Sequence, residues 1–234
     1  MTDPVRSRVL FVGLVGLWSL FSTIAPIPAT TLSPAAPILR VPTTNGPTSS
    51  ADQPRIVAFG DSLTAGLGVG AAESYPAQLQ RRLEDLGYHY RVVNAGVSGE
   101  TTAGGVRRVA WVLKSQPTIV ILELGANDGL RGLNPRETQV NLERIIQQLQ
   151  QARVTVVLAG MKMPPNYGVE YTKAFEAIYP ALARRYRLKL IPFFLEGIAG
   201  SSKLNQADGI HPTAEGYRLI VDKILQTVQP LLKR

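Results

Sequence analysis

From residue 55 onward the chain alternates between short apolar runs and segments whose apolar residues follow helical spacing. Five runs rich in Val and Ile predict strands at 55–60, 90–96, 118–125, 153–160 and 188–194. Their nearly continuous hydrophobicity is typical of strands that are buried on both faces. Apolar residues spaced three and four apart predict helices around 142–149, 175–182 and 217–228. Strands separated by helices indicate a parallel sheet with helices on both faces, which is a three-layer α/β/α fold.

The first 54 residues have a different pattern. Arg6 and Arg8 precede an apolar run from Val9 to about Ile24, as in an export signal. The run is somewhat shorter than the roughly 20 residues that span a bilayer, and no clear A-x-A cleavage site follows. We therefore predict that residues 1–29 are a signal peptide or an uncleaved membrane anchor. We therefore expect the protein to be exported to the periplasm or another location outside the cytoplasm. There it is either secreted or anchored by the uncleaved N-terminal segment.

Residues 30–54 contain five prolines and eight Ser or Thr, a composition that cannot build a core. We interpret this segment as a linker, which leaves residues 55–234 as one domain. The chain has no Cys and only two His, His89 and His211, so thiolate and His-rich metal sites are excluded. The net charge is +8, but the basic residues are scattered and follow no nucleic-acid-binding motif. We expect a monomer with no metal, no cofactor and no nucleic-acid partner.

Polar residues follow the predicted strands at the edge where parallel sheets bind ligands. Ser62 lies directly after the first strand, at a turn into a helix, where it is a candidate nucleophile. His211 can act as its base, and Asp208, three residues earlier, can hold the imidazole in one tautomer. The Ser62 N–H, the Gly99 N–H and the Asn127 amide are candidate donors to an oxyanion.

Four blocks in order, "GDSLTAG", "NAGVSGETT", "GANDGLRGL" and "DGIHP", resemble those of the SGNH (GDSL) hydrolase family. The similarity is greatest to its bacterial acyl thioesterase, lysophospholipase and arylesterase branch. The resemblance implies a flavodoxin-like α/β/α fold with a five-stranded parallel sheet and no cofactor. It also implies a serine hydrolase of carboxylic esters or thioesters of acyl chains, with Ser62, Asp208 and His211 as the catalytic triad and Ser62, Gly99 and Asn127 as the oxyanion hole.

The same resemblance suggests where an acyl substrate would bind. The segment "GLRGL" resembles a mobile loop that closes on acyl chains, and "MKMPPNYG" resembles the wall of an acyl groove. The substrate-binding residues expected on this basis are Leu130, Leu133, Met161, Met163 and Pro164. Ordinary core packing is the competing interpretation for the two methionines.

Three other interpretations of these residues predict different functions. Gly66, Gly68 and Ala71 fit the dinucleotide-binding pattern G-x-G-x-x-A, but they begin six residues beyond the strand, so we prefer a loop beside the substrate site. A carbohydrate O-acetyl esterase would use the same catalytic residues, and a non-catalytic binding module would lack one of them. Asp61 is expected to organise the nucleophile turn, and Glu123, in an apolar strand, to make a structural hydrogen bond.

Overall fold

The computed structural model describes residues 53–234, so the predicted N-terminal segment and nearly all of the predicted linker lie outside the described residues. Its centre is a five-stranded parallel sheet in the order β2-β1-β3-β4-β5, which confirms the predicted sheet. The strands are β1 (Arg55–Gly60), β2 (Arg91–Gly96), β3 (Pro117–Glu123), β4 (Thr155–Ala159) and β5 (Lys189–Ile191).

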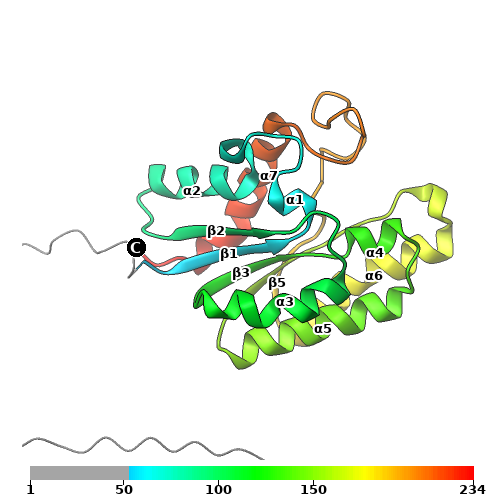
Figure 1. Cartoon of the computed structure of the whole chain (residues 1–234), viewed down its shortest axis with the longest axis horizontal. Helices are drawn as coiled ribbons and strands as arrows, with labels where there is room; N and C mark the ends of the chain where they lie inside the picture. Colours follow the sequence, from blue (N-terminus) through cyan, green and yellow to red (C-terminus); the bar gives the residue numbers. More distant parts are fainter. Residues whose placement is uncertain (1–52) are drawn as a thin grey trace, which may run out of the picture. The chain divides into compact units, whose positions relative to one another are not determined.

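Helices cover both faces of the sheet (Figure 1). On one face lie α1 (Ser62–Ala65), α2 (Tyr75–Asp85) and α7 (Ala214–Val228), and on the other lie α3 (Thr102–Lys114), α4 (Ala126–Leu130), α5 (Pro135–Gln151) and α6 (Val169–Tyr186). Three short 3₁₀ helices complete the described elements: η1 (Ala71–Glu73), η2 (Pro165–Tyr167) and η3 (Gln229–Leu231). The arrangement is the three-layer α/β/α fold expected from the sequence pattern.

The core lies between the sheet and these two helical layers. Val120, Ile121 and Leu122 of β3 are fully buried, as expected for a central strand covered on both sides. The helices contribute the apolar stripes that their spacing predicted, such as Leu142 and Ile146 of α5. Within the described residues, no helix combines the length and the hydrophobicity needed to cross a bilayer.

The connection after β1 leads to β2 on one side of the sheet, and the connection after β3 leads to β4 on the other side. The two connections thus diverge at the carboxyl ends of β1 and β3. In open parallel sheets this switch point is where ligands bind. The chain leaves β1 into α1 and β3 into α4 at this edge, and the long loop between β5 and α7 reaches it too (Figure 1). At the opposite edge, Arg91 donates its N–H to the Pro54 carbonyl, and Lys233 donates its N–H to the Tyr90 hydroxyl. Both ends of the described chain therefore lie at the amino ends of the strands.

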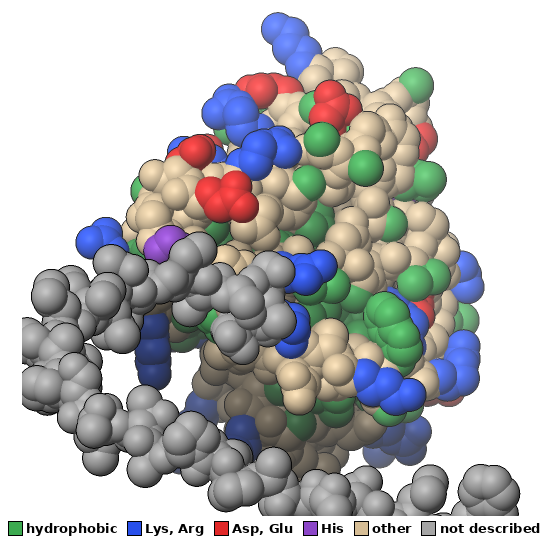
Figure 2. Space-filling view, turned by 60° about the vertical axis from the view of Figure 1, so that its left-hand side comes forward, with side chains coloured by type: hydrophobic (Ala, Val, Ile, Leu, Met, Phe, Trp, Pro, Cys, Tyr) green, Lys and Arg blue, Asp and Glu red, His purple; other side chains and the backbone are tan. Residues whose placement is uncertain are grey.

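Surface charge is spread over the domain. On the face shown in Figure 2, Lys and Arg side chains are distributed over the surface, with acidic side chains between several of them. Within residues 53–234, no group of three or more His, Asp or Glu side chains is arranged to hold a metal ion.

Candidate active site

Three side chains from two segments form a hydrogen-bonded chain at the switch point. Ser62 is the first residue of α1, and His211 and Asp208 come from the loop before α7. The Ser62 Oγ lies 2.9 Å from His211 Nε2, and His211 Nδ1 lies 2.6 Å from Asp208 Oδ2. Because Asp208 accepts from the Nδ1–H, the Nε2 atom is left free to accept the serine proton. This arrangement can convert a hydroxyl into a nucleophile.

The loop that carries the imidazole is held by its own carboxylate. Asp208 Oδ1 accepts the backbone N–H groups of Ile210 at 2.9 Å and His211 at 3.0 Å. The His211 N–H is the main cause that lowers the pKa of Asp208 to about 2, followed by the Ile210 N–H and the His211 ring. The carboxylate is therefore ionised at neutral pH. One side chain thus sets both the loop geometry and the orientation of the imidazole.

A second carboxylate lies beneath the nucleophile turn. Asp61 is fully buried and caps α1, accepting the Leu63 N–H at 3.0 Å. Its other oxygen accepts the side-chain amide of Asn127 at 3.0 Å. Burial raises the pKa of Asp61 to about 6, and the hydrogen bonds from Leu63 and Asn127 oppose this rise. Asp61 therefore organises the turn, as expected, and also fixes the rotamer of Asn127.

Of the two remaining predicted oxyanion donors, Asn127 lies beside Ser62 in the cavity lining, whereas Gly99 is in the loop after β2 and is not among the lining residues. Asn127 lies in the first turn of α4, and its Nδ2 carries a second hydrogen that the Asp61 bond leaves free. Gly99 has a φ of 78°, a conformation that favours glycine. Its carbonyl accepts a hydrogen bond from the Arg131 guanidinium at 2.8 Å. The loop after β2 is thus connected to the residue that follows α4.

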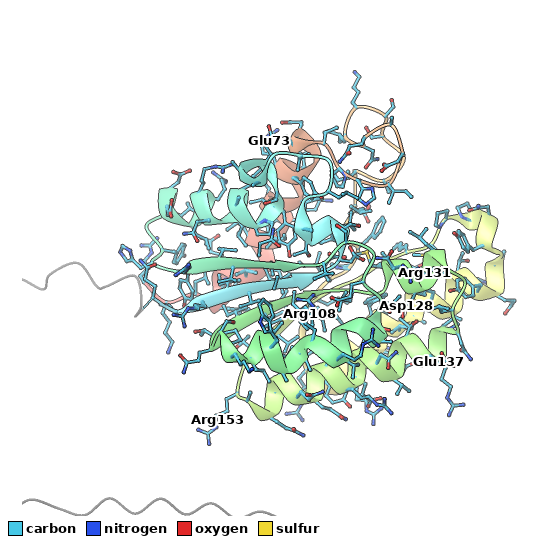
Figure 3. The ribbon with its side chains drawn as sticks, viewed as in Figure 1. Glu73, Arg108, Asp128, Arg131, Glu137 and Arg153 are labelled. Atoms are coloured by element: carbon cyan, nitrogen blue, oxygen red, sulfur yellow. The ribbon has the colours of Figure 1, made fainter. Side chains whose placement is uncertain are left out.

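The α4 segment is anchored from the protein interior. Asp128 is buried and accepts the N–H of Thr102 at 2.8 Å, together with the hydroxyl of the same residue. The Thr138 hydroxyl lies 3.3 Å from the same carboxylate. Figure 3 labels Asp128 and Arg131 together at the α4 end of the domain. This anchoring ties α4 to α3 and α5, and so supports the position of Asn127.

A cavity of about 550 Å³ opens beside Ser62, within the size range of small-molecule sites. Its wall is mainly apolar, and Lys162 is its one basic side chain apart from His211. The residues that line it are Asp61, Ser62, Leu63, Ala126, Asn127, Leu130, Met161, Lys162, Met163, Pro164, Pro165, Phe193, Leu195, Ala199, Gly200, Gly209, Ile210 and His211. None of the residues 66–70 belongs to this lining, so the glycine loop is not part of the cavity wall.

Most of the predicted substrate-binding residues line this cavity. Leu130, Met161, Met163 and Pro164 do, whereas Leu133 does not: its side chain is 39% exposed. The Leu133 carbonyl accepts the Tyr171 hydroxyl at 2.8 Å, which holds the backbone of this loop against α6.

Sequence reasoning missed several cavity residues, among them Leu63, Phe193, Leu195 and Ile210. The apolar run at 188–194 predicts that Phe193 belongs to the fifth strand, but that strand ends at Ile191. Pro192 follows it and has no N–H to donate to a neighbouring strand. The position of Ile210 between Asp208 and His211 was the available signal for that residue.

Comparison with known proteins identifies the fold and the family. Residues 58–219 match the GDSL-like Lipase/Acylhydrolase family. The chain belongs to this family. It is 42% identical over 186 residues to "Esterase TesA" from Pseudomonas aeruginosa, covering 79% of this chain and 92% of that protein. It is 39% identical over 178 residues to "Thioesterase 1/protease 1/lysophospholipase L1" from Escherichia coli, covering 76% and 84%.

A solved structure supports the same assignment. The crystal structure of TesA superposes with a TM-score of 0.74 at 43% identity, covering 76% of this chain and 99% of that chain. The predicted SGNH hydrolase fold is thereby confirmed, as is the prediction of a carboxylic ester hydrolase.

Proposed function

We propose that this protein hydrolyses esters and thioesters of apolar acyl chains through an acyl-enzyme on Ser62. The observation that supports it best is the hydrogen-bonded chain from Asp208 through His211 to Ser62, which ends at the apolar cavity. A polar nucleophile beside an apolar wall suits a substrate whose reactive carbonyl carries a hydrocarbon chain. The names of the esterase and thioesterase relatives support the same substrate class.

The geometry supports a two-step mechanism. Ser62 Oγ attacks the carbonyl carbon while its proton passes to His211 Nε2, and Asp208 stabilises the imidazolium that forms. The carbonyl oxygen gains the negative charge, which the Ser62 N–H, the Gly99 N–H and the free Asn127 amide hydrogen stabilise in this proposal. The intermediate collapses, and the alcohol or thiol leaves with the proton from His211. Water then attacks acyl-Ser62 with His211 again as the base, which releases the carboxylic acid.

Replacement of the nucleophile tests this proposal. Ser62→Ala should reduce hydrolysis of p-nitrophenyl butyrate to background, while circular dichroism and thermal unfolding stay those of a folded domain. Ser115→Ala is the matched control: the Ser115 hydroxyl donates to the Val112 carbonyl at the end of α3, and its loss should leave the rate unchanged. Hydrolysis by Ser62→Ala well above background would contradict the mechanism.

A series of p-nitrophenyl esters tests the substrate class. Because the cavity wall is apolar, the ratio kcat/KM should rise from acetate to longer acyl chains, by up to roughly tenfold for each pair of buried methylene groups. A preference for acetate would instead favour the carbohydrate O-acetyl esterase alternative. One relative, with 26% identity over 218 residues, is an "Acetylxylan esterase" from Xylanibacter ruminicola, of which the matched region covers 45%.

The proposal extends to the whole chain. Residues 55–234 would be the catalytic domain, residues 30–54 a linker, and residues 1–29 an export signal or anchor that places a monomeric enzyme outside the cytoplasm. The support is the sequence pattern of Arg6 and Arg8 before an apolar run, followed by the Pro, Ser and Thr-rich segment. Intact-mass analysis of the protein from the membrane and soluble fractions would show whether the segment is cleaved, and light scattering would report the oligomeric state.

A further inference from the structure

A third carboxyl group lies under the nucleophile turn, and the mechanism above does not use it. Glu123 is the last residue of β3 and is fully buried. Its Oε2 accepts the Thr64 hydroxyl of α1 at 2.7 Å and lies 3.4 Å from the Asp61 backbone nitrogen. A Cβ on Gly60 would lie only 2.4 Å from this Oε2, so the glycine makes room for the carboxyl group. The segment that presents Ser62 therefore rests directly on Glu123.

The turn needs such support because α1 is very short. Its four residues cannot form a stable helix by themselves, since helices of this length do not recover the cost of nucleation. Asp61 caps the helix from its N-terminal side, and Glu123 holds it through Thr64 from below. A displacement of the nucleophile by about 1 Å can cost about 10²-fold in rate. The position of Ser62 thus depends on two buried carboxyl groups.

The surroundings of Glu123 disfavour a negative charge. The groups that face it are Asp61, Thr64 of α1, Tyr75 of α2, Tyr179 of α6 and Tyr217 of α7, of which Asp61 is the charged one at neutral pH. Within residues 53–234, Glu123 forms no ion pair. Burial, followed by the Asp61 charge, raises the pKa of Glu123 well above its usual value. Two adjacent buried anions without a cation would be costly.

The hydrogen bonds distinguish the two oxygens of this carboxyl group. Oε2 faces the donors of the turn, whereas Oε1 is buried and has no protein partner. The Tyr217 hydroxyl is also buried without a partner, and after burial the Glu123 charge has the largest effect on its pKa. An uncharged carboxyl keeps one oxygen as an acceptor and carries its proton on the other, so the proton fits Oε1, which accepts no hydrogen bond from the turn.

We propose that Glu123 is a positioning residue for Ser62 that works as an uncharged carboxylic acid, with Oε2 holding the turn and Oε1 carrying the proton. This inference rests on the proposed role of Ser62. It differs from a purely structural hydrogen bond because the protonation state matters: ionised Glu123 would repel Asp61 across the turn. The two carboxyl groups then have separate tasks, since Asp61 holds Asn127 as an anion and Glu123 holds Thr64 as a neutral acid.

Two substitutions test the protonation state against the hydrogen bond. Glu123→Gln keeps an oxygen acceptor and a donor without a charge, so kcat should stay within about threefold of the wild-type value. Glu123→Leu removes both polar atoms at similar volume, and kcat should fall by about 10-fold to 100-fold while KM changes little. Thr64→Val, which removes only the donor to Oε2, should lower kcat in the same direction and provides the test if Glu123→Leu does not fold.

The pH dependence of stability and kcat is a second test, because a purely structural hydrogen bond of Glu123 would leave it unchanged. A raised pKa means that the folded state binds a proton which the unfolded state loses above its ordinary pKa, so stability declines as the pH rises toward the folded-state pKa. The unfolding temperature and kcat, measured from about pH 5 to about pH 10, should therefore decrease more with rising pH for the wild type than for Glu123→Gln. Infrared difference spectra at about pH 8 should contain a protonated carboxyl band that Glu123→Gln lacks.

The outcomes separate this proposal from the proposed function. Equal losses of kcat in Glu123→Gln and Glu123→Leu would show that a carboxylate is needed and would overturn the proposal. Wild-type kcat in Glu123→Leu and Thr64→Val would reduce Glu123 to a structural residue, which also overturns it. The infrared band does not depend on activity, so its absence would refute the neutral acid even if Ser62→Ala behaves as expected. Activity that survives in Ser62→Ala would instead refute the proposed function.

Discussion

Asn127→Ala isolates the contribution that we propose for Asn127 in stabilising the oxyanion. The Asn127 amide has two hydrogens, one of which binds Asp61 at 3.0 Å, and the other is free at the cavity wall. Alanine removes both without touching the triad. Loss of one such side-chain donor lowers kcat by about 10²–10³, or about 2.7–4 kcal/mol of transition-state stabilisation. We expect a decrease of this size, with KM within about threefold because the ground-state carbonyl needs the donor less.

The substitution has a second expected effect on Asp61. The Asn127 bond is one of the causes that lower the pKa of Asp61 against the effect of burial, so its removal should raise that pKa above about 6. A group with a raised folded-state pKa loses its contribution to stability as the pH rises through that pKa. Asn127→Ala should therefore be less stable at neutral pH than the wild type, and the difference should shrink toward about pH 4.

The assay is hydrolysis of p-nitrophenyl butyrate at saturating substrate, with unfolding followed in parallel. Asn134→Ala is the matched control, because Asn134 caps α5 by accepting the Arg136 N–H at 3.0 Å and lies outside the cavity lining. It should lose about 1 kcal/mol of stability and keep its kcat. A folded Asn127→Ala variant with kcat within tenfold of wild type would refute the assignment of Asn127 to the oxyanion hole.

Four further substitutions test other parts of the site and the fold. Asp208→Asn should lower kcat roughly 10⁴-fold, because the base loses its orientation, and His211→Ala roughly 10⁶-fold, because the base itself is lost. Equal losses of the two variants in single-turnover assays would argue against these separate roles of Asp208 and His211. Gly105→Ala should destabilise the domain by about 1–3 kcal/mol in urea titrations, because the added Cβ would lie 2.5 Å from Leu124 Cδ1. This loss is expected despite the better helix propensity of Ala, and a stabilised variant would show that the core can adjust. Arg131→Ala should lower kcat about fivefold, because about 1 kcal/mol of charge-assisted hydrogen bonding to the Gly99 carbonyl is lost at an exposed site. An unchanged kcat would mean that this hydrogen bond does not position Gly99.

Much of the fold followed from the sequence because it depends on local and repetitive patterns. The apolar run of β3 predicted a central strand, and the spacing of Leu142 and Ile146 predicted the buried face of α5. The candidate catalytic residues followed from a rule of topology, since Ser62 and Asn127 come directly after strands that end at the same edge. Nucleophile and base lie 149 residues apart, and short blocks with limited chemical alternatives were enough to pair them.

The parts that could not be predicted depend on contacts between distant segments. The sequence predicts that Leu133 binds substrate, but Leu133 lies outside the cavity lining. Its carbonyl accepts the hydroxyl of Tyr171 in α6, a contact that the sequence does not reveal. The partner of Glu123 was expected but could not be named, because Thr64 reaches it only when α1 is placed over the end of β3. The hydrogen bond between Asn127 and Asp61 likewise joins residues 66 positions apart. Side-chain networks of this kind are properties of the assembled layers.

The location of the two ends of the described domain has a practical consequence for using it. Residue 53 and Arg234 lie at the amino ends of the strands, whereas the residues that line the cavity follow their carboxyl ends. A strand of six residues such as β1 is about 20 Å long, so this distance separates either end from the substrate opening. In a protein shortened to residues 53–234, an affinity tag, a fusion partner or a solid support can therefore be attached at either end without blocking substrate entry. A peptide joining the two neighbouring ends would also offer a starting point for circular permutation.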